Sequence, residues 1–415
     1  MKKQVVRKGF IVNEGARKKL PACQLEIGMF VSDLDQPWIE TPFLMQGFMV
    51  ETQEHIDLVR ELCEYVYIDQ VQQRYVPPEE RAISTTKSPS RYIHKVSVET
   101  ECAAAGNVYK EARSLTKSMM DSVSLGNAFD ADQAKQTVSE CVNSILRNPD
   151  ALMWLGKIRN VNSHVADHSL NVAILAVAFG RSLDMDPEEL NNLGLCGLVH
   201  DIGKMKVPAE ILKKETPYTE HEEQIVQSHA LYGRNILMAN RNLFSGATDV
   251  AHCHHERIDG TGYPRGLKEV GISTFTRIIA IVDTYDTITM GTPNSAPQST
   301  LSAMRHLYSL RGKHFDDKLV LQFIQCIGLY PPGSIVELRN GEVGIVISTN
   351  LKNRRLPKIL LQLDQNKRPQ KPKIINLGVE EQQGPNQEYL IRDMLVNGSH
   401  NIDIRKHLKE GLEFS

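Results

Sequence analysis

Histidine and aspartate side chains that could bind metal cluster in the middle of this 415-residue chain. Eight of the 14 histidines lie between residues 164 and 255, which makes this stretch the place to look for ligands. They are His164, His168, His200, His221, His229, His252, His254 and His255. Imidazole together with carboxylate suits iron, manganese, nickel, cobalt or zinc, so Asp201 and Asp283 are candidate ligands as well. A single histidine is usually a core or surface residue, and the prediction therefore depends on order and spacing.

The pair His200 and Asp201 follows an apolar run, Leu193 to Val199, and stands just before Ile202-Gly203-Lys204. The end of a helix can present both side chains to one ion, and the two oxygens of Asp201 can bridge to a second ion. Two metal ions about 4 Å apart stabilise the attacking and leaving oxygens in phosphate-ester hydrolysis, and Lys204 would then face the phosphate. The alternative is a capped helix end with an ordinary salt bridge.

Four segments of different composition make up the chain, and its length predicts two or three domains. The first alternates short apolar runs with turns and predicts a small α+β domain. The second is rich in Pro, Ser, Thr and charge, which is typical of a linker. The third carries apolar residues at helical spacing, and the fourth predicts a β-rich region. Their bounds are 1–70, 71–100, 101–330 and 331–415.

Local signals support the last two assignments. Asp186 before Pro187 predicts the start of a helix, and Thr219 with Glu222 forms a capping box. In the last segment, the Asn340-Gly341 turn separates two apolar runs and predicts a hairpin. We therefore expect a multidomain protein with an all-α domain between two smaller domains.

Composition excludes several classes of function. Lys and Arg total 48 against 50 for Asp and Glu, so there is no basic field for binding DNA. The seven cysteines are scattered, with no C-x-x-C pair, which argues against a disulfide framework or a zinc ribbon and fits a reducing cytoplasm. No run approaches the ~20 apolar residues of a membrane helix, so neither export nor membrane insertion is expected.

Six short motifs occur in a fixed order in the helical segment. They are HSLNVA with His168, HDIGK at 200–204, SHALYG with His229, HHE at 254–256, DGTGYP at 259–264, and RIIAIVDTYD with Asp283. In these motifs the chain resembles the HD-GYP family of cyclic di-GMP phosphodiesterases. The segment 25–69 likewise resembles the uncharacterised domain that commonly precedes HD-GYP domains, and PPGSIVELRNGEVGIVI resembles the tail that follows them.

The resemblance implies an all-α HD-type catalytic domain that holds two divalent transition-metal ions, such as iron or manganese. It implies that the first ion is bound by His168, His200, Asp201 and Asp283. It implies that the second is bound by the bridging Asp201 with His229, His254 and His255. Glu256 would support these ligands from behind. The loop that names the family matches Asp259, Gly260, Gly262, Tyr263 and Pro264, and its Gly and Pro content independently predicts a tight turn.

Two departures from the family pattern affect the expected site. Some members bind a third ion through a glutamate four residues before the first histidine, where this chain has His164; two ions are the expectation, with His164 as a candidate third-metal ligand. The family also carries a basic RPYR-like segment that grips substrate phosphates, where this chain has Thr292 and Ser295. Losing such a charge-assisted contact costs about 1.5 to 3 kcal/mol. Arg277 is a candidate replacement.

The expected function is hydrolysis of cyclic di-GMP to the linear dinucleotide pGpG, and further to GMP as an open alternative. Asp201 and Lys204 are the expected catalytic residues, and Lys204, Tyr263, Arg277, Thr292 and Ser295 the expected substrate contacts. The competing hypothesis is a weakly active or non-catalytic receptor that keeps the metal site. Diguanylate cyclase (GGDEF) domains and a second copy of the chain are candidate partners.

Overall fold

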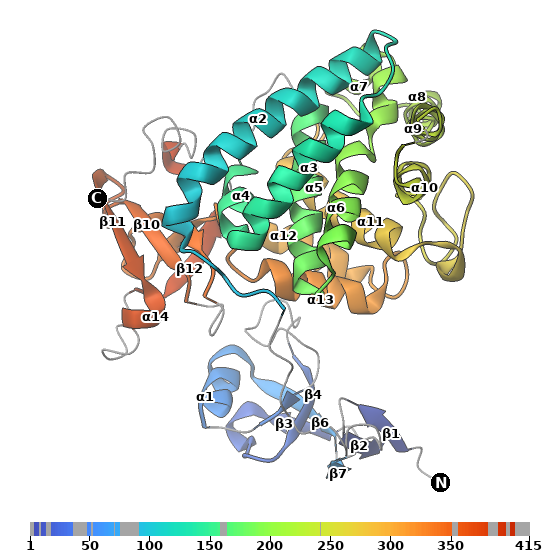
Figure 1. Ribbon diagram of the computed structural model, residues 1–415. Coiled ribbons are helices and arrows are strands. Elements are labelled where there is room, and N and C mark those ends of the chain that lie inside the picture. The colour runs from blue at the N-terminus through green and yellow to red at the C-terminus, as the bar shows by residue number, and fades with distance from the viewer. Residues whose placement is uncertain are drawn as a thin grey trace. The chain divides into compact units, whose positions relative to one another are not determined.

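The protein forms two compact units, Met1–Ser90 and Arg91–Ser415, in the computed structural model shown in Figure 1. The second unit contains both the helical segment and the β-rich segment that follows it. The residues described are 4–7, 10–13, 18–35, 48–50, 53–69, 71–74, 91–157, 164–240, 242–350, 356–380, 389–395 and 399–402.

The first unit consists of two small antiparallel sheets and one helix. One sheet has the order β1-β2-β7 and the other the order β3-β6-β4-β5. The elements are β1 (Gln4–Arg7), β2 (Phe10–Asn13), β3 (Lys18–Pro21), β4 (Phe30–Leu34), β5 (Phe48–Met49), α1 (Gln53–Leu62), β6 (Tyr65–Asp69) and β7 (Val71–Arg74). Ile56 and Val59 of α1 are buried, as are Val31 and Val66 of the larger sheet. Burial of these apolar side chains stabilises the unit.

The expected linker, 71–100, carries ordered structure at both of its ends. β7 pairs with β2 in the first unit. At the other end, the Arg91 amide donates to the Asp184 carboxylate (3.0 Å) and the Tyr92 hydroxyl donates to the Met185 carbonyl (2.8 Å). Residues 75–90, where the linker composition is most pronounced, lie outside the described residues.

The second unit is mostly helical, as the apolar spacing predicts. Its helices are α2 (Val98–Ser124), α3 (Ala131–Arg147), α4 (Pro149–Leu155), α5 (His164–Ser182), α6 (Pro187–Val199), α7 (Ala209–Leu212), α8 (Glu220–Gln227), α9 (His229–Met238), α10 (Ser245–Cys253), α11 (Thr274–Met290), α12 (Thr300–Ser309) and α13 (Asp317–Ile327). The capping boxes at Asp186 and Thr219 are both formed. None of the helices in the described part of the chain is long and apolar enough to cross a membrane.

Helices α5 and α6 form the centre of this unit, and both are buried along most of their length. They approach so closely that a Cβ added to Gly197 would lie 2.8 Å from the Ala173 Cα atom. Only glycine permits this backbone contact. Because a short turn joins the two helices, the start of α5 lies beside the end of α6, and the His168 and His200 rings lie 5.2 Å apart.

A five-stranded antiparallel sheet with the order β11-β10-β9-β8-β12 follows the helices. Its elements are β8 (Ile335–Leu338), β9 (Val343–Ser348), β10 (Lys358–Leu363), β11 (Pro369–Asn376), α14 (Leu377–Glu380) and β12 (Ile391–Leu395). The predicted hairpin is confirmed, with Gly341 at φ +90° in the turn between β8 and β9. The buried carboxylate of Asp150 in α4 accepts the Thr349 amide (2.9 Å), which ties the sheet to the helices.

The 3-10 helix η3 (Ile202–Lys206) packs directly against the start of α9. A Cβ added to Gly203 would lie 1.9 Å from the His229 carbonyl oxygen and 2.4 Å from the Gly233 nitrogen. Both obstacles are backbone atoms, which cannot rotate away. Gly203 therefore sets the distance between the residues that follow α6 and the histidine that begins α9.

Gly203→Ala is expected to lower the free energy of unfolding by about 1–3 kcal/mol or more, because overpacking forces the backbones apart. Chemical denaturation of wild type and variant measures the difference. Gly233→Ala is the matched control, since its Cβ would meet neighbours only at 3.5 Å or beyond, and alanine favours a helix. Equal stability of the Gly203 variant and wild type would contradict the close approach.

Candidate metal centre

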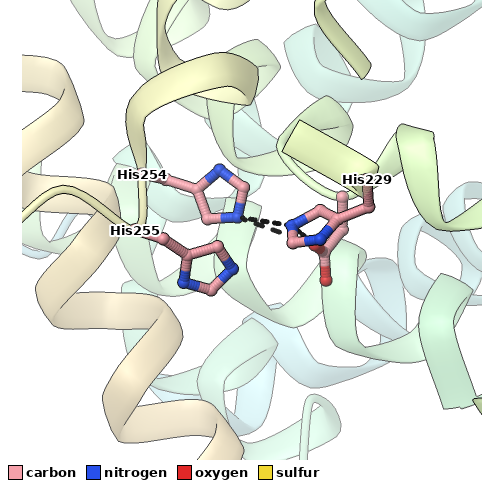
Figure 2. A group of neighbouring side chains, drawn as sticks. His229, His254 and His255 are labelled. Carbon is pink, nitrogen blue, oxygen red and sulfur yellow. Dashed lines mark hydrogen bonds and ion pairs between the residues drawn. The ribbon is translucent and has the colours of Figure 1, made fainter. Parts of the chain in front are cut away.

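Seven predicted ligands converge from five places in the second unit. They are His168 in α5, His200 and Asp201 after α6, His229 at the start of α9, His254 and His255 after α10, and Asp283 in α11. Figure 2 shows His229 facing His254 and His255, which come from the other side of the site. The Nε2 atoms of His229 and His254 lie 3.4 Å apart.

These ligands fall into two groups, each compact enough to hold one ion. Within each group, one ligand atom per residue lies within 4.8 Å of the others. The first group is His168, His200 and Asp283, and the second is Asp201, His229, His254 and His255. The arrangement matches the two ligand sets implied by the sequence motifs, with Asp201 between them.

The carboxylate of Asp201 turns one oxygen toward each group. Its Oδ2 atom lies 3.5 Å from His168 Nε2 and 3.4 Å from His200 Nε2. Its Oδ1 atom lies 3.4 Å from His229 Nε2 and 3.7 Å from His254 Nε2. A carboxylate placed in this way can bind two ions at once.

Hydrogen bonds from Nδ1 to backbone carbonyls orient three of the histidines. His200 Nδ1 donates to the Gly197 carbonyl (2.8 Å), and His229 Nδ1 donates to the Val226 carbonyl (2.6 Å). His254 Nδ1 donates likewise to the carbonyl of Val250 (3.1 Å). A carbonyl can only accept, so the proton of each neutral ring lies on Nδ1 and the Nε2 lone pair is available to a metal.

Unsatisfied buried atoms at the centre test whether metal ions fit. Three of them lack a hydrogen-bond partner among the described residues, namely His168 Nε2, His200 Nε2 and Asp201 Oδ1. Leaving a buried polar atom unsatisfied costs about 1–3 kcal/mol. All three atoms are of metal-ligand type and belong to the groups described above, so the residues present fit a divalent ion in each group.

The electrostatics of the second group favour ligation. Burial lowers the pKa of His229 to about 3, and it also lowers the pKa of His254 and of His255. Burial alone would raise the pKa of Asp201, but the Lys204 ammonium and the His200 ring beside it outweigh burial and hold the pKa well below the usual value. The imidazoles are therefore neutral and the carboxylate is ionised, which is the form that binds metal.

His168 differs from the other histidines because carboxylates face both of its nitrogens. Nε2 lies 3.1 Å from Asp283 Oδ1, and Nδ1 lies 2.7 Å from Asp286 Oδ2. Burial would lower its pKa, but these two carboxylates raise the pKa to about 9. A metal ion entering the first group at neutral pH therefore displaces a proton from His168.

Lys204 lies beside the shared carboxylate, with Nζ 2.5 Å from Asp201 Oδ2. Burial would lower the pKa of this amine, but the charges of Asp201 and Asp283 raise it above the usual value. Lys204 is therefore a fixed positive charge at the edge of the metal centre.

The DGTGYP loop packs against the HHE segment. Glu256 accepts the backbone amides of Arg265 (2.7 Å) and Leu267 (2.8 Å), so its carboxylate holds the end of the loop. A Cβ on Gly262 would lie 2.5 Å from the Glu256 Cα atom. The Tyr263 ring stacks on the His255 ring, with centroids 4.7 Å apart.

The other loop positions shape its turn. The Asp259 carboxylate accepts the amide and the hydroxyl of Thr261. Gly260 has φ +85°, a left-handed conformation that favours glycine. Pro264 is exposed and follows Tyr263.

Three other residues predicted to contact the substrate instead make contacts within the protein. The Arg277 guanidinium donates to Asp316 (3.1 Å) and to the carbonyls of Ile272 and Glu269, so it clamps the start of α11. Thr292 and Ser295 pair with each other through their backbones and close a tight turn after α11. His164 begins α5, and its side chain lies outside the described residues.

Sequence reasoning missed Asp286, which lies one turn after Asp283 in α11 and orients His168. Asn171 donates to the other oxygen of Asp286 at 3.4 Å and to the Gly156 carbonyl at 2.6 Å. The motif RIIAIVDTYD contains two aspartates at D-x-x-D spacing. Nothing in the motif indicates that Asp283 belongs to the ligand group and that Asp286 instead contacts the His168 ring.

Asp286→Asn is expected to weaken metal binding by the first group about 10- to 100-fold, because loss of such an orienting carboxylate makes the histidine a poorer ligand. Competition with a graded chelator measures the affinity of each ion. Asp249→Asn in α10 is the control, since Asp249 contacts Cys253 and Thr276 and belongs to neither group. Unchanged affinities would show that Asp286 has no part in positioning His168.

Comparison with known proteins agrees with this geometry. The HD domain family matches residues 156–319, and a domain of unknown function (DUF3391) matches residues 17–134. A cyclic di-GMP phosphodiesterase of Pseudomonas aeruginosa is 33% identical over 374 residues, which is 87% of this chain and 89% of the relative.

Two further relatives match shorter stretches. A cyclic di-GMP phosphodiesterase of Thermotoga maritima is 30% identical over 46% of this chain and 52% of its own length. A 3'3'-cGAMP-specific phosphodiesterase of Vibrio cholerae is 39% identical over 34% of this chain and 33% of its own length. From the nearly full-length similarity to the Pseudomonas protein and the matching HD domain, we conclude that the chain belongs to the HD-GYP family of cyclic di-GMP phosphodiesterases.

Proposed function

We propose that this protein is a metal-dependent phosphodiesterase that opens cyclic di-GMP to linear pGpG. The observation that carries the proposal is the position of Asp201, whose two oxygens face two separate groups of metal ligands. One carboxylate shared between two ions is the arrangement that phosphate-ester hydrolysis uses. The name of the Pseudomonas relative, which aligns over most of both chains, supports cyclic di-GMP as the substrate.

Each part of the site has a role in this reaction. When bound, the two ions supply Lewis-acid stabilisation of the charge that develops on the phosphate oxygens. The five histidines and Asp283 would hold the ions, and Asp201 would be a ligand shared by both groups. Lys204 presents its ammonium group to the phosphate. Tyr263, stacked on His255, borders the site and can contact the substrate.

The ligand set suits a divalent transition metal, iron and manganese among them, because several imidazoles combine with carboxylates. The receptor alternative is less well supported, since both ligand groups are complete and the full-length relative is named as an enzyme. A third ion, further cleavage to GMP, association with GGDEF domains, self-association and a cytoplasmic location stay predictions.

The direct test is to load the purified full-length protein with Mn²⁺ or Fe²⁺, incubate it with cyclic di-GMP, and separate the products by chromatography. Formation of pGpG supports the proposal. A parallel incubation with 3'3'-cGAMP addresses the substrate class of the Vibrio relative. Turnover of 3'3'-cGAMP alone would overturn cyclic di-GMP as the substrate, and turnover of neither would overturn the enzyme.

Asp201→Ala is expected to remove bound metal and hydrolysis together, because it deletes the ligand that the two groups share. Elemental analysis and the product assay are run on the same preparation. His221→Ala is the matched control, since His221 is exposed on α8 and belongs to neither group. A variant of Asp201 that keeps two ions per chain and the wild-type rate would refute the shared-ligand assignment.

Lys204→Met is expected to leave the metal bound but to lower kcat about tenfold or more, as loss of a preorganised charge at a developing anion does. Lys206→Met is the control, because the Lys206 amine is exposed and donates to the Val123 carbonyl. Steady-state kinetics on metal-replete protein measures kcat. If kcat of the Lys204 variant equals that of wild type, Lys204 does not contribute to the chemistry.

A further inference from the structure

Arg257 directly follows the HHE segment and lies between the metal centre and the turn that joins α12 to α13. The next residue, Ile258, donates its backbone amide to the His314 carbonyl (3.1 Å). The Arg257 guanidinium carbon lies 4.9 Å from the centre of the Phe315 ring. Phe315 is buried, so the guanidinium lies against a ring whose position is fixed by packing.

Among the described residues, the guanidinium of half-buried Arg257 forms no ion pair with a carboxylate. The polar contact that it makes with them is a long one, 3.5 Å from Nη1 to the Glu256 carbonyl. By contrast, Arg277 pairs with Asp316 at 3.1 Å, and Arg113 with Asp167 at 2.6 Å.

A partly desolvated arginine without a counterion is costly. Such a group is therefore suited to an anion that arrives from solution. Guanidinium presents several N–H donors in a rigid plane, which matches the oxygens of a phosphate.

The backbone of Arg257 lies beside the metal centre. Arg257 follows the candidate ligand His255 by two residues. A Cβ added to Gly262 would lie 2.4 Å from the Arg257 nitrogen, so Arg257 packs against the DGTGYP loop. Tyr263 of that loop stacks on the His255 ring.

Most of the residues expected to bind the substrate phosphates are unsuited to that role in the structure. Thr292 and Ser295 are uncharged and close a turn on each other, and the Arg277 guanidinium is used by Asp316. Lys204 is the remaining charged residue of the predicted contacts, and it lies against the shared carboxylate of the metal centre. A cyclic dinucleotide carries two phosphates, and only one of them reacts at a time.

We propose that Arg257 binds the non-reacting phosphate of the cyclic dinucleotide while the metal centre and Lys204 act on the other phosphate. The proposal rests on the proposed function, because it assumes a substrate with two phosphodiesters. A contact to the non-reacting phosphate is equally strong in the bound substrate and in the transition state, so it lowers KM and leaves kcat unchanged.

The test compares kcat and KM for cyclic di-GMP in metal-replete wild type, Arg257→Met and Lys313→Met. Arg257→Met keeps an unbranched apolar side chain but removes the charge, and it is expected to raise KM about tenfold or more, with kcat within about twofold and metal content unchanged. Lys313→Met removes an exposed cation from the neighbouring turn and is expected to leave both constants unchanged. Added salt should raise KM more steeply in wild type than in Arg257→Met.

A second variant, Arg257→Lys, distinguishes the effect of losing the charge from the effect of disturbed packing. It keeps the positive charge, so its KM should lie between those of wild type and Arg257→Met if the charge is what matters. Equal KM values for wild type and Arg257→Met would overturn the proposal. A fall in kcat at constant KM would overturn it too, because the group would then act on the reacting phosphate.

Direct binding separates this proposal from the proposed function. If wild type does not turn over cyclic di-GMP, the enzyme proposal fails, and equilibrium dialysis with the same nucleotide decides the role of Arg257. Binding by wild type that is lost in Arg257→Met supports the phosphate contact. Absence of binding by wild type overturns both proposals.

Discussion

The shared carboxylate of Asp201 is the interaction around which the second unit is built. It is almost completely buried, and its two oxygens face two groups of histidines. An ionised carboxylate is costly to bury unless partners compensate it. Lys204 compensates part of the charge, and metal ions would compensate the rest. Its position immediately after α6 allows the two groups, which come from widely separated parts of the chain, to share one ligand.

Close backbone approaches give the centre its geometry. Gly197 brings α6 against α5, Gly203 brings η3 against α9, and Gly262 brings the DGTGYP loop against the HHE segment. At each of these positions a side chain would collide with a neighbouring backbone. The three contacts bring helix ends to the centre, where Asp283 joins them from the middle of α11. Carbonyls near the helix ends orient His200, His229 and His254.

The sequence predicts the ligands far better than it predicts their supports. Two features made the ligands recognisable, namely residue types that bind metal and motifs in a fixed order. The helix caps at Asp186 and Thr219 and the hairpin at Gly341 are local, so they too were predictable. Asp286 and Arg257 acquire their roles from contacts through space, with His168 and Phe315, which no local pattern encodes. The sequence predicts Arg277 equally well as a phosphate-binding residue, but in the structure it pairs with Asp316.

The net charge of the whole chain and the local charge at the metal centre predict different affinities for anions. The chain has a formal net charge of -2, which argues against a strong attraction to polyanions such as DNA. At the metal centre the balance would be reversed. Burial keeps the imidazoles of His229, His254 and His255 neutral. Two divalent ions would exceed the charge of the two ligand carboxylates, and Lys204 and Arg257 would add to the surplus. The attraction for a phosphate diester is thus confined to the centre, where the substrate must lose its water. A small dianion can therefore be selected by a protein whose overall charge is slightly negative.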